Sequence, residues 1–358
     1  MNSGLDDVVA AETVLSDVDG TRGRLVIRGV SLDTLVASAR FESAVELMFD
    51  GLLEPTDWAE AIGRARADVY PLLRDAGTLV ELPPTDAVRA LIARLPDTTE
   101  ADAAATLIGA HAVFTAGMLR LSRGQMPIAP DPSLPHAADF LRMSTAAIPA
   151  EQQVAALDRY LVTVIDHGLN ASTFVARIVA STQAGLTSSA LAAFGALKGP
   201  LHGGAPGPVL DMLDAIGAPA NAYTWLEAAL NRGERLMGFG HRIYRVRDPR
   251  ADALKGAVRL LAASGTIDPQ RLALAEAVEQ AALDLLRRRK PDRALDINVE
   301  FYTALLLEAL GFPREAFTCV FASGRVAGWI AHAREQALTG RLVRPRSVYV
   351  GPEPREAA

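Results

Sequence analysis

Stretches in which apolar residues recur at helical spacing follow one another from about residue 33 to residue 340, and this regularity limits the chain to a largely helical fold. Alanine and leucine are abundant, whereas aromatic residues make up only 6% of the chain, and both features favour helices over strands. With 358 residues, 50% of them hydrophobic, the chain can bury a large core and is expected to form two lobes. We therefore predict an all-α protein.

One β element is expected near the N-terminus. Apolar runs at residues 12–16 and 23–28 flank an Asp-Gly pair, which predicts a β-hairpin with its turn at residues 17–20. From there on the pattern is helical. Helix N-caps are predicted at Asp33, at Asn170 or Ser172, and at Asp268 and Asn298. Predicted helices cover residues 34–40, 41–49, 57–76, 85–95, 100–122, 137–143, 151–165, 170–181, 186–197, 206–216, 224–231, 248–263, 268–289, 298–310 and 315–338.

Bulk charge and cysteine content exclude several classes of function. The net charge of −6 argues against nucleic acid or an anionic membrane as the main partner. Cys319 is the only cysteine, so an intramolecular disulfide and a cysteine-based metal site are excluded. The first residues lack the apolar stretch of a signal peptide, and no uninterrupted apolar run of about 18 residues occurs. We expect a cytoplasmic protein without a membrane span.

The stretch 199–205 places His202 between a proline and two glycines, in the most glycine-rich part of the chain. Glycines there would let the backbone adopt positive φ and let another molecule approach closely. Two later stretches resemble partners for it: 238–242, which contains His241, and 298–302, which contains Glu300. Together they suggest an acid/base site that is assembled from distant segments.

For any single histidine, a structural role is the commoner case, and it is our interpretation of His111 and His136. By contrast, His167, His202 and His241 each lie in a glycine-containing break between predicted helices, where functional side chains are often displayed. A metal site is the rival interpretation of these three histidines. They show no HExxH or paired-histidine spacing, and the glycines before His241 do not complete a dinucleotide-binding pattern. We expect no metal site.

Basic residues cluster after His241. They could form a solvated helix start or an anion site, and arginine grips carboxylates through two parallel hydrogen bonds. The cluster contains Arg242, Arg245, Arg247 and Arg250. A second basic run, residues 287–290, ends a predicted helix, where its charge is at least as well explained by the helix dipole.

A glutamate and one helix face near the C-terminus each allow both a structural and a functional interpretation. Glu300 falls in the first turn of a helix, where it could complement the helix dipole or act as a catalytic base. Arg325, Trp329 and His332 share one face of the last long helix. That face is expected to pack in the core around the tryptophan, and a buried arginine would then need a partner.

Taken in order, these motifs resemble the citrate synthase family, which includes 2-methylcitrate synthases, and the short bacterial type in particular. The resemblance covers nearly the whole chain. It rests on the hairpin ending at residues 24–29, His167 with residues 170–173, and the stretches 199–205, 237–242 with 248–250, 298–302, 324–329 and 344–346.

The resemblance implies a two-domain multihelical fold and a homodimer. Residues 1–205 and 313–358 would form the large domain, and residues 206–312 the small domain that closes over the substrates. The implied activity is that of an acyltransferase that joins the acyl group of acetyl-CoA or propionyl-CoA to oxaloacetate and then hydrolyses the thioester. Coenzyme A enters as a substrate, and no other cofactor is implied.

The resemblance also implies a role for each site residue. The catalytic residues would be His202, which hydrogen-bonds the thioester oxygen, His241, which protonates the oxaloacetate carbonyl, and Glu300, which removes the α-proton. Oxaloacetate would be held by His167, Arg250, Arg325 and the partner subunit's Arg344. CoA would be bound by Leu236, Met237, Gly238, Gly240 and Arg245.

Glu300 departs from the family, which usually has aspartate at this place. The extra methylene moves the carboxylate by roughly one carbon–carbon bond, and a misplacement of about 1 Å can cost on the order of 100-fold in rate. Two alternatives therefore stay open: a weakly active or inactive paralogue that binds oxaloacetate or CoA in a regulatory role, and a citryl-CoA lyase.

Overall fold

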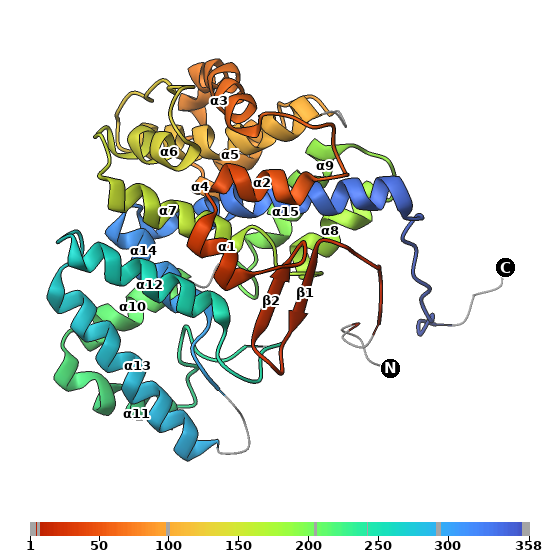
Figure 1. The fold of residues 1–358 in the computed structure, drawn as a ribbon. Helices are drawn as coiled ribbons and strands as arrows, with labels where there is room; N and C mark the ends of the chain where they lie inside the picture. Colours follow the sequence, from red (N-terminus) through yellow and green to blue (C-terminus); the bar gives the residue numbers. More distant parts are fainter. Residues whose placement is uncertain are drawn as a thin grey trace.

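The computed structural model describes residue 5 and residues 8–97, 101–203, 206–241, 243–290 and 295–352. Gly204, Ala205 and Arg242, which belong to the sequence motifs above, lie outside these ranges. Within them the chain forms fifteen α-helices, three short 3-10 helices and one small sheet (Figure 1). The predicted all-α class is therefore confirmed.

The sheet has three short antiparallel strands: β1 (Ser16–Asp19), β2 (Arg24–Ile27) and β3 (Val30–Ser31). The predicted hairpin is present, but its position was wrong, because Ser16 pairs with Ile27 and Asp19 with Arg24. The turn therefore lies at residues 20–23 instead of 17–20. Asp19 makes this turn, since its carboxylate accepts hydrogen bonds from the backbone amides of the two residues after Gly20.

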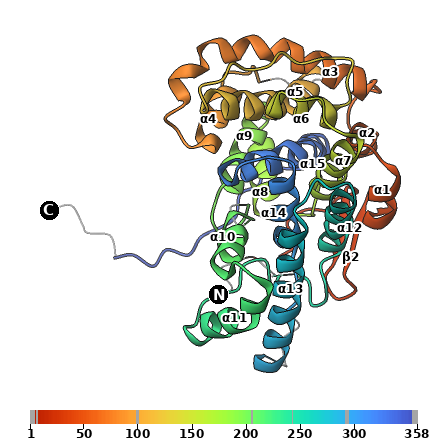
Figure 2. The same ribbon diagram turned by 90° about the vertical axis from the view of Figure 1, so that its left-hand side faces the viewer.

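Most of the hydrophobic core lies around α5 and α15, which other helices cover (Figures 1 and 2). By length and composition α5 could span a membrane, but 83% of its apolar window is buried among other helices, as in a core helix. The helices of the first part are α1 (Leu32–Ser38), α2 (Phe41–Phe49), α3 (Trp58–Val69), α4 (Pro84–Ile92), α5 (Ala101–Leu121), α6 (His136–Thr145), α7 (Glu151–Val164), α8 (Ala171–Ala180) and α9 (Leu186–Leu197).

Helices α10 to α13 gather at one end of the molecule, in the lower part of Figure 1. The chain then returns through α14 to α15. The bounds are α10 (Pro206–Ile216), α11 (Ala222–Asn231), α12 (Pro249–Ala263), α13 (Pro269–Arg289), α14 (Val299–Ala309) and α15 (Phe317–Thr339). After α15 the chain is extended and exposed, and Figure 2 shows it leading away from the helical body.

Two helix boundaries differ from the prediction for identifiable reasons. Ser31, not Asp33, caps α1, because its hydroxyl accepts the amide of Thr34 and the helix begins at Leu32. The predicted helix 57–76 is α-helical only as far as Val69. Pro71 has no amide hydrogen to continue the ladder, and the chain goes on as a 3-10 helix over Tyr70–Leu79.

Of the N-caps that matter for the site, those of α8 and α14 were predicted from the sequence, whereas the cap of α12 was not. Asn170 caps α8 through its side-chain oxygen, which settles the choice between Asn170 and Ser172. Asp248 caps α12 and Asn298 caps α14 in the same way. Arg250 and Glu300 consequently sit in the first turns of α12 and α14.

Candidate active site

His202 is held by the first turn of α8. The backbone amide of Ser172 lies 3.3 Å from Nε2 of His202, and the hydroxyl of Ser172 lies 2.8 Å from the same nitrogen. Because a backbone amide can only donate, Nε2 must accept, and the neutral ring then carries its proton on Nδ1. Burial, together with the charges of Arg325 and Arg250, lowers the pKa of His202 to about 4. His202 is therefore a neutral hydrogen-bond donor through Nδ1.

The loop of His202 uses its glycines differently from the prediction. Neither Gly199 nor Gly203 has positive φ, so the prediction was wrong for these two glycines, whereas Gly204 lies outside the described residues. Gly203 is needed for space instead, since a Cβ there would lie 2.6 Å from Cδ1 of Leu197. Positive φ occurs in the loop of the second histidine, at Gly238 (+82°) and Gly240 (+85°).

His241 is fixed by its own loop. Its Nδ1 accepts the backbone amides of Ile243 (3.0 Å) and Tyr244 (3.1 Å), which leaves the proton of the neutral ring on Nε2. Nη2 of Arg250 lies 3.2 Å from this Nε2. Two donors thus face each other with no acceptor between them. An oxygen atom of a ligand could accept a hydrogen bond from both.

His167 completes a cluster of aromatic rings around His241. Nε2 of His167 lies 3.1 Å from the hydroxyl of Tyr244, and the two histidine rings are 5.7 Å apart between centroids. Burial and the charges of Arg250 and Arg325 lower the pKa of His167 well below its ordinary value. We did not single out Tyr244 from the sequence, where the only signal was an aromatic residue three positions after His241.

Asp248 caps α12 and also organises this side of the site. Its buried carboxylate accepts Nε and Nη2 of Arg250 (3.0 and 2.8 Å) and the backbone amide of Val299 (3.3 Å). Burial alone would lower the pKa of Arg250, but the carboxylate of Asp248 outweighs it and the net shift is upward. Asp248 therefore joins the first turns of α12 and α14 through one charged group.

Short backbone pairing links the loop of His241 to the segment before Glu300. Phe239 and Ile297 form an antiparallel bridge, and the amide of Asn298 donates to the carbonyl of Gly238 (2.9 Å). The side chain of Asn298 in turn donates to the carbonyl of Gly240 (3.0 Å). His241 and Glu300, which are 59 positions apart, are thereby held in a fixed relation.

Glu300 is largely buried, and within the described part of the chain its carboxylate forms no hydrogen bond or ion pair. Burial raises its pKa from 4.5 to about 7, Asp248 adds to the rise, and Arg250 and Arg235 oppose it. A carboxylate with these properties is poised to take up a proton near neutral pH.

Arg325 is buried on α15, as expected for that helix face. Its Nε donates to the carbonyl of Val164 (2.5 Å), and its guanidinium lies over the ring of Phe321. Its Nη2 is buried and has no hydrogen-bond partner among the described residues. Burial lowers the pKa of Arg325 to about 10, so it remains charged at neutral pH. Among the described residues this donor is unpaired, and a ligand oxygen could accept a hydrogen bond from it.

The other two residues on that face connect the site to the core. Nε1 of Trp329 donates to the hydroxyl of Ser172 (3.2 Å). His332 contacts Oδ2 of Asp166 (3.3 Å) and accepts Nε of Arg177 at its other nitrogen (3.0 Å). The predicted core role of Trp329 is therefore confirmed, and it additionally supports Ser172.

Three other arginines that the sequence pointed to lie in different surroundings. Arg247, for which a solvated helix start and an anion site both stayed open, is paired with Asp252, Glu279 and Asp296, so the anion-site interpretation is wrong for this residue. Arg245 is exposed. Arg344 is exposed in the extended segment after α15.

His111 and His136 are buried away from these loops, in agreement with the structural role expected for them. Within the ranges described above, no three His, Cys, Asp or Glu side chains lie close enough together to hold a metal ion.

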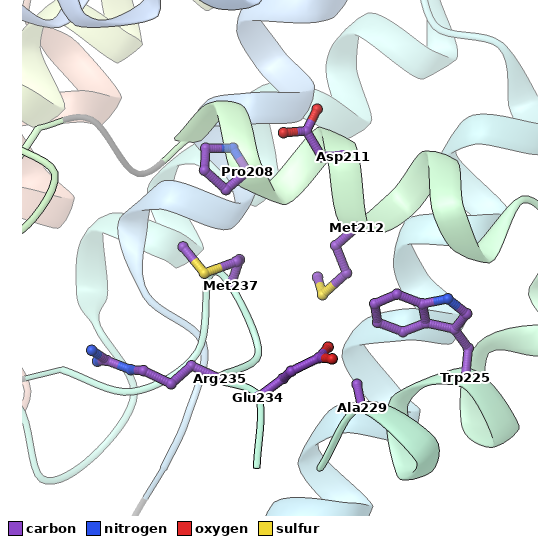
Figure 3. A pocket seen from close by; sticks show the side chains of 8 residues that line it. All are labelled: Pro208, Asp211, Met212, Trp225, Ala229, Glu234, Arg235 and Met237. Carbon is purple, nitrogen blue, oxygen red and sulfur yellow. The ribbon is translucent and has the colours of Figure 1, made fainter. Parts of the chain in front are cut away.

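A pocket of about 270 Å³ lies beside the loop that leads to His241 (Figure 3). Met212 and Trp225 give it an apolar wall, whereas Glu234 and Arg235 add charged groups. Met237, one of the residues predicted to bind CoA, is part of its lining (Figure 3). The full lining is Pro208, Asp211, Met212, Trp225, Ala229, Glu234, Arg235 and Met237.

Comparison with known proteins agrees with this geometry. The family model described as "Citrate synthase, C-terminal domain" matches residues 4–346. The chain is 39% identical over 361 residues to "Putative citrate synthase 2" of Mycobacterium tuberculosis, covering 98% of this chain and 93% of that protein. It is 37% identical over 370 residues to the 2-methylcitrate synthase of the same organism, covering 99% and 92%.

Solved structures show the same fold. The citrate synthase from Pyrobaculum aerophilum superimposes with a TM-score of 0.87 at 34% identity, covering 99% of this chain and 93% of that one. The enzyme from Thermoplasma acidophilum, solved as a ternary complex with carboxymethyl coenzyme A and oxaloacetate, has a TM-score of 0.85 at 30% identity, covering 100% and 98%.

Proposed function

This chain belongs to the citrate synthase family, and we propose that it joins the acyl group of acetyl-CoA or propionyl-CoA to oxaloacetate and then hydrolyses the thioester. The observation that carries this proposal is that Arg250 interacts electrostatically with both a neutral donor, His202, and a carboxylate of raised pKa, Glu300. These are the two groups that enolisation of a thioester requires, an oxygen-binding donor and a base.

In the proposed first step, Glu300 removes a proton from the α-carbon of the acyl group while Nδ1–H of His202 hydrogen-bonds the thioester oxygen. The α-proton is a weak acid, so stabilisation of the developing negative charge on oxygen is essential. Because the pKa of Glu300 is raised to about 7, its carboxylate is a stronger base than an exposed glutamate. It is still ionised in a useful fraction of molecules at neutral pH.

In the second step, the enolate carbon attacks the ketone carbon of oxaloacetate and a C–C bond forms. Nε2–H of His241 delivers a proton to the ketone oxygen, which becomes the hydroxyl group of the product, and the proton that Glu300 took up balances the one that His241 gives away. Arg250 stands beside that nitrogen and can hydrogen-bond the same oxygen or a neighbouring carboxylate. The free Nη2 of Arg325 and the ring of His167 would hold the oxaloacetate carboxylates. Water then cleaves the C–S bond, and CoA leaves as a thiol.

We assign the CoA moiety to the pocket beside Met237 (Figure 3). The apolar wall formed by Met212 and Trp225 suits part of the CoA molecule, and the backbone of residues 236–240 borders the same loop. The thioester end of CoA would then lie toward Glu300, whose charge interacts with Arg235 of the pocket lining. Arg245 remains a proposed contact of the CoA phosphates.

Assembly and motion form part of the same proposal. Residues 206–312 would move as a small domain against the rest of the chain and exclude water during condensation. Two subunits would form a homodimer in which the partner subunit's Arg344 completes each oxaloacetate site, since this arginine is exposed in the extended segment. We place the enzyme in the cytoplasm.

The test is release of free thiol from acetyl-CoA and from propionyl-CoA at equal oxaloacetate concentration. We expect oxaloacetate-dependent release from at least one of them, with citrate or 2-methylcitrate formed in equal amount. The ratio of kcat/KM values identifies the preferred acyl group, although one methylene is worth only about 1–3 kcal/mol. Supplying citryl-CoA separates a lyase from a synthase: acetyl-CoA as the main product, instead of citrate, would contradict the proposal.

A further inference from the structure

The N-terminal hairpin touches both loops that carry the histidines of the proposed oxaloacetate site. At its base, the hydroxyl of Ser16 bonds the carboxylate of Asp166 and accepts the amide of Gly168 (3.0 Å), on either side of His167. At its tip, the carbonyl of Gly20 accepts the amide of Arg245 (2.8 Å), four residues after His241. Figure 1 shows the hairpin extending from the level of α15 down beside α12.

Contact at the tip is backbone against backbone. A Cβ on Gly20 would overlap the carbonyl oxygen of Ile243 and lie 2.8 Å from its carbonyl carbon. A Cβ on Gly23 would lie 2.8 Å from Cγ2 of Val246. The φ of Gly20 is outside the left-handed region, so the position requires glycine for space and not for conformation. The tip and the loop over residues 243–247 therefore fix each other's position.

The base of the hairpin is anchored in the core. Asp166, which receives the hydroxyl of Ser16, is buried and also contacts His332 on α15. Cγ2 of Val18 lies 3.2 Å from the place where a Cβ on Gly168 would be, so β1 packs closely on the loop of His167. One end of β1 is thus fixed to the residues on either side of His167.

A displacement of the tip would reach His241 directly. The amides of Ile243 and Tyr244 are the two donors that orient the His241 ring, and the hydroxyl of Tyr244 reaches His167. We propose that the hairpin is a positioning strut, in which Gly20 at the tip and Ser16 at the base set the relation of His241 to His167. The strut acts on the oxaloacetate half of the site. The pocket beside Met237 has no lining residue from the hairpin.

A matched pair of glycine substitutions tests the strut. Gly20→Ala inserts a methyl group against Ile243 without straining φ. Gly29→Ala inserts the same group into the turn between β2 and β3 of the same sheet, at a positive φ (+82°) and with nothing within 4 Å. The control therefore strains the sheet next to the hairpin without touching the loop, whereas the test variant displaces the loop.

The first readout is hydrogen–deuterium exchange of the peptide that contains the Arg245 amide, which needs no catalytic activity. Gly20→Ala should speed exchange there, and Gly29→Ala should leave it as in the wild type. The second readout rests on the proposed function. Gly20→Ala should raise KM for oxaloacetate about tenfold or more and lower kcat, since misplacement by about 1 Å can cost on the order of 100-fold. KM for the acyl-CoA should stay within about twofold, because an unchanged pocket keeps its binding free energy.

Unchanged exchange and unchanged KM in Gly20→Ala would overturn the strut, and so would equal changes in both variants. If Gly20→Ala does not fold, Ser16→Ala replaces it. This change removes the oxygen that bridges Asp166 and Gly168 and adds no bulk, and it should raise KM for oxaloacetate while leaving KM for the acyl-CoA unchanged. If the wild-type protein has no condensing activity, the proposed function is refuted but the proposed role of the hairpin is not. That role is still tested by the hydrogen–deuterium exchange experiment, which needs no activity.

Discussion

The backbone amide of Ser172 donates to Nε2 of His202, and this contact fixes which nitrogen of the ring carries the proton. The donor belongs to the first turn of α8 and the acceptor to the loop after α9, so the tautomer is set by how two segments pack. A main-chain donor cannot be lost by substitution of its side chain. The proposed catalytic state of His202 therefore depends on the fold of the α8 N-terminus more than on the identity of residue 172.

This relationship predicts different outcomes for two substitutions. His202→Ala removes the donor to the thioester oxygen and should lower kcat by on the order of 100- to 1000-fold. Ser172→Ala keeps the amide and should retain kcat within about tenfold. It should lower the melting temperature, because Nε1 of Trp329 loses its buried acceptor. Steady-state kinetics and thermal unfolding of the two variants check this. A loss of kcat in Ser172→Ala as large as in His202→Ala would contradict the tautomer argument.

The raised pKa of Glu300 predicts a pH-dependent effect on stability. A carboxyl group whose pKa rises on folding binds its proton more tightly in the folded state. Ionisation therefore costs stability, increasingly as pH rises from 4.5 to about 7. Glu300→Gln removes this cost. It should increase the free energy of unfolding at pH 8 by up to about 3 kcal/mol and leave it little changed near pH 4.5. Denaturant unfolding at both pH values measures the difference, and an equal effect at both would count against a buried, ionising Glu300.

The same pKa predicts the acid limb of the rate profile. The base must be ionised to act, so kcat/KM should fall about tenfold per pH unit below a pKa near 7. The pKa values of His202 and His241 are lowered to about 4, so protonation of these histidines should not change kcat/KM above pH 5. A profile that stays flat from pH 8 to pH 5.5 would show that another group takes the proton.

Asp248 should matter for both stability and substrate binding. Asp248→Ala leaves the buried Arg250 without its counter-charge and the amide of Val299 without an acceptor. Loss of one partner of a buried ion pair typically costs about 3–5 kcal/mol. Urea unfolding should show a loss of this order, and KM for oxaloacetate should rise. Asp248→Asn, which keeps an acceptor oxygen, should be intermediate. If Asp248→Ala unfolds at the same urea concentration as the wild type, the stabilising role of Asp248 is contradicted.

The dimer proposal can be tested by complementation. Arg344→Ala and His202→Ala should each be nearly inactive alone. In a mixed dimer, one site combines an intact His202 with the partner subunit's intact Arg344, so co-expression should restore activity. If Arg344 instead serves its own subunit, no site in the mixed dimer is intact and activity stays absent.

Sequence patterns predicted the helices well where local signals dominate. Pro206–Ile216 and Leu186–Leu197 have the predicted bounds, and Asn298 caps α14 as expected, because caps and breakers act within a few residues. The hairpin turn was misplaced, since its register is set by the pairing of Ser16 with Ile27 and not by the Asp-Gly pair alone.

The partners within the site could not be predicted in the same way. The sequence marks Arg247 and Arg250 alike as basic residues at the start of a helix, yet Arg247 is neutralised by three carboxylates and Arg250 faces His241. Only the packing of α12, α13 and α14 decides between these outcomes. Ser172 and Tyr244 were missed as site residues for a similar reason, because their contacts join segments far apart in the chain.

The central claim is that Glu300 is the base of a condensing enzyme. The most direct measurement is oxaloacetate-dependent release of CoA from acetyl-CoA and propionyl-CoA at pH 8 by the wild type and by Glu300→Gln in parallel. We predict turnover by the wild type with at least one thioester and a loss in the variant on the order of 100- to 10,000-fold, the usual contribution of a general base. Glu300→Gln releasing CoA at the wild-type rate, or a wild type that releases none from either thioester, would contradict it.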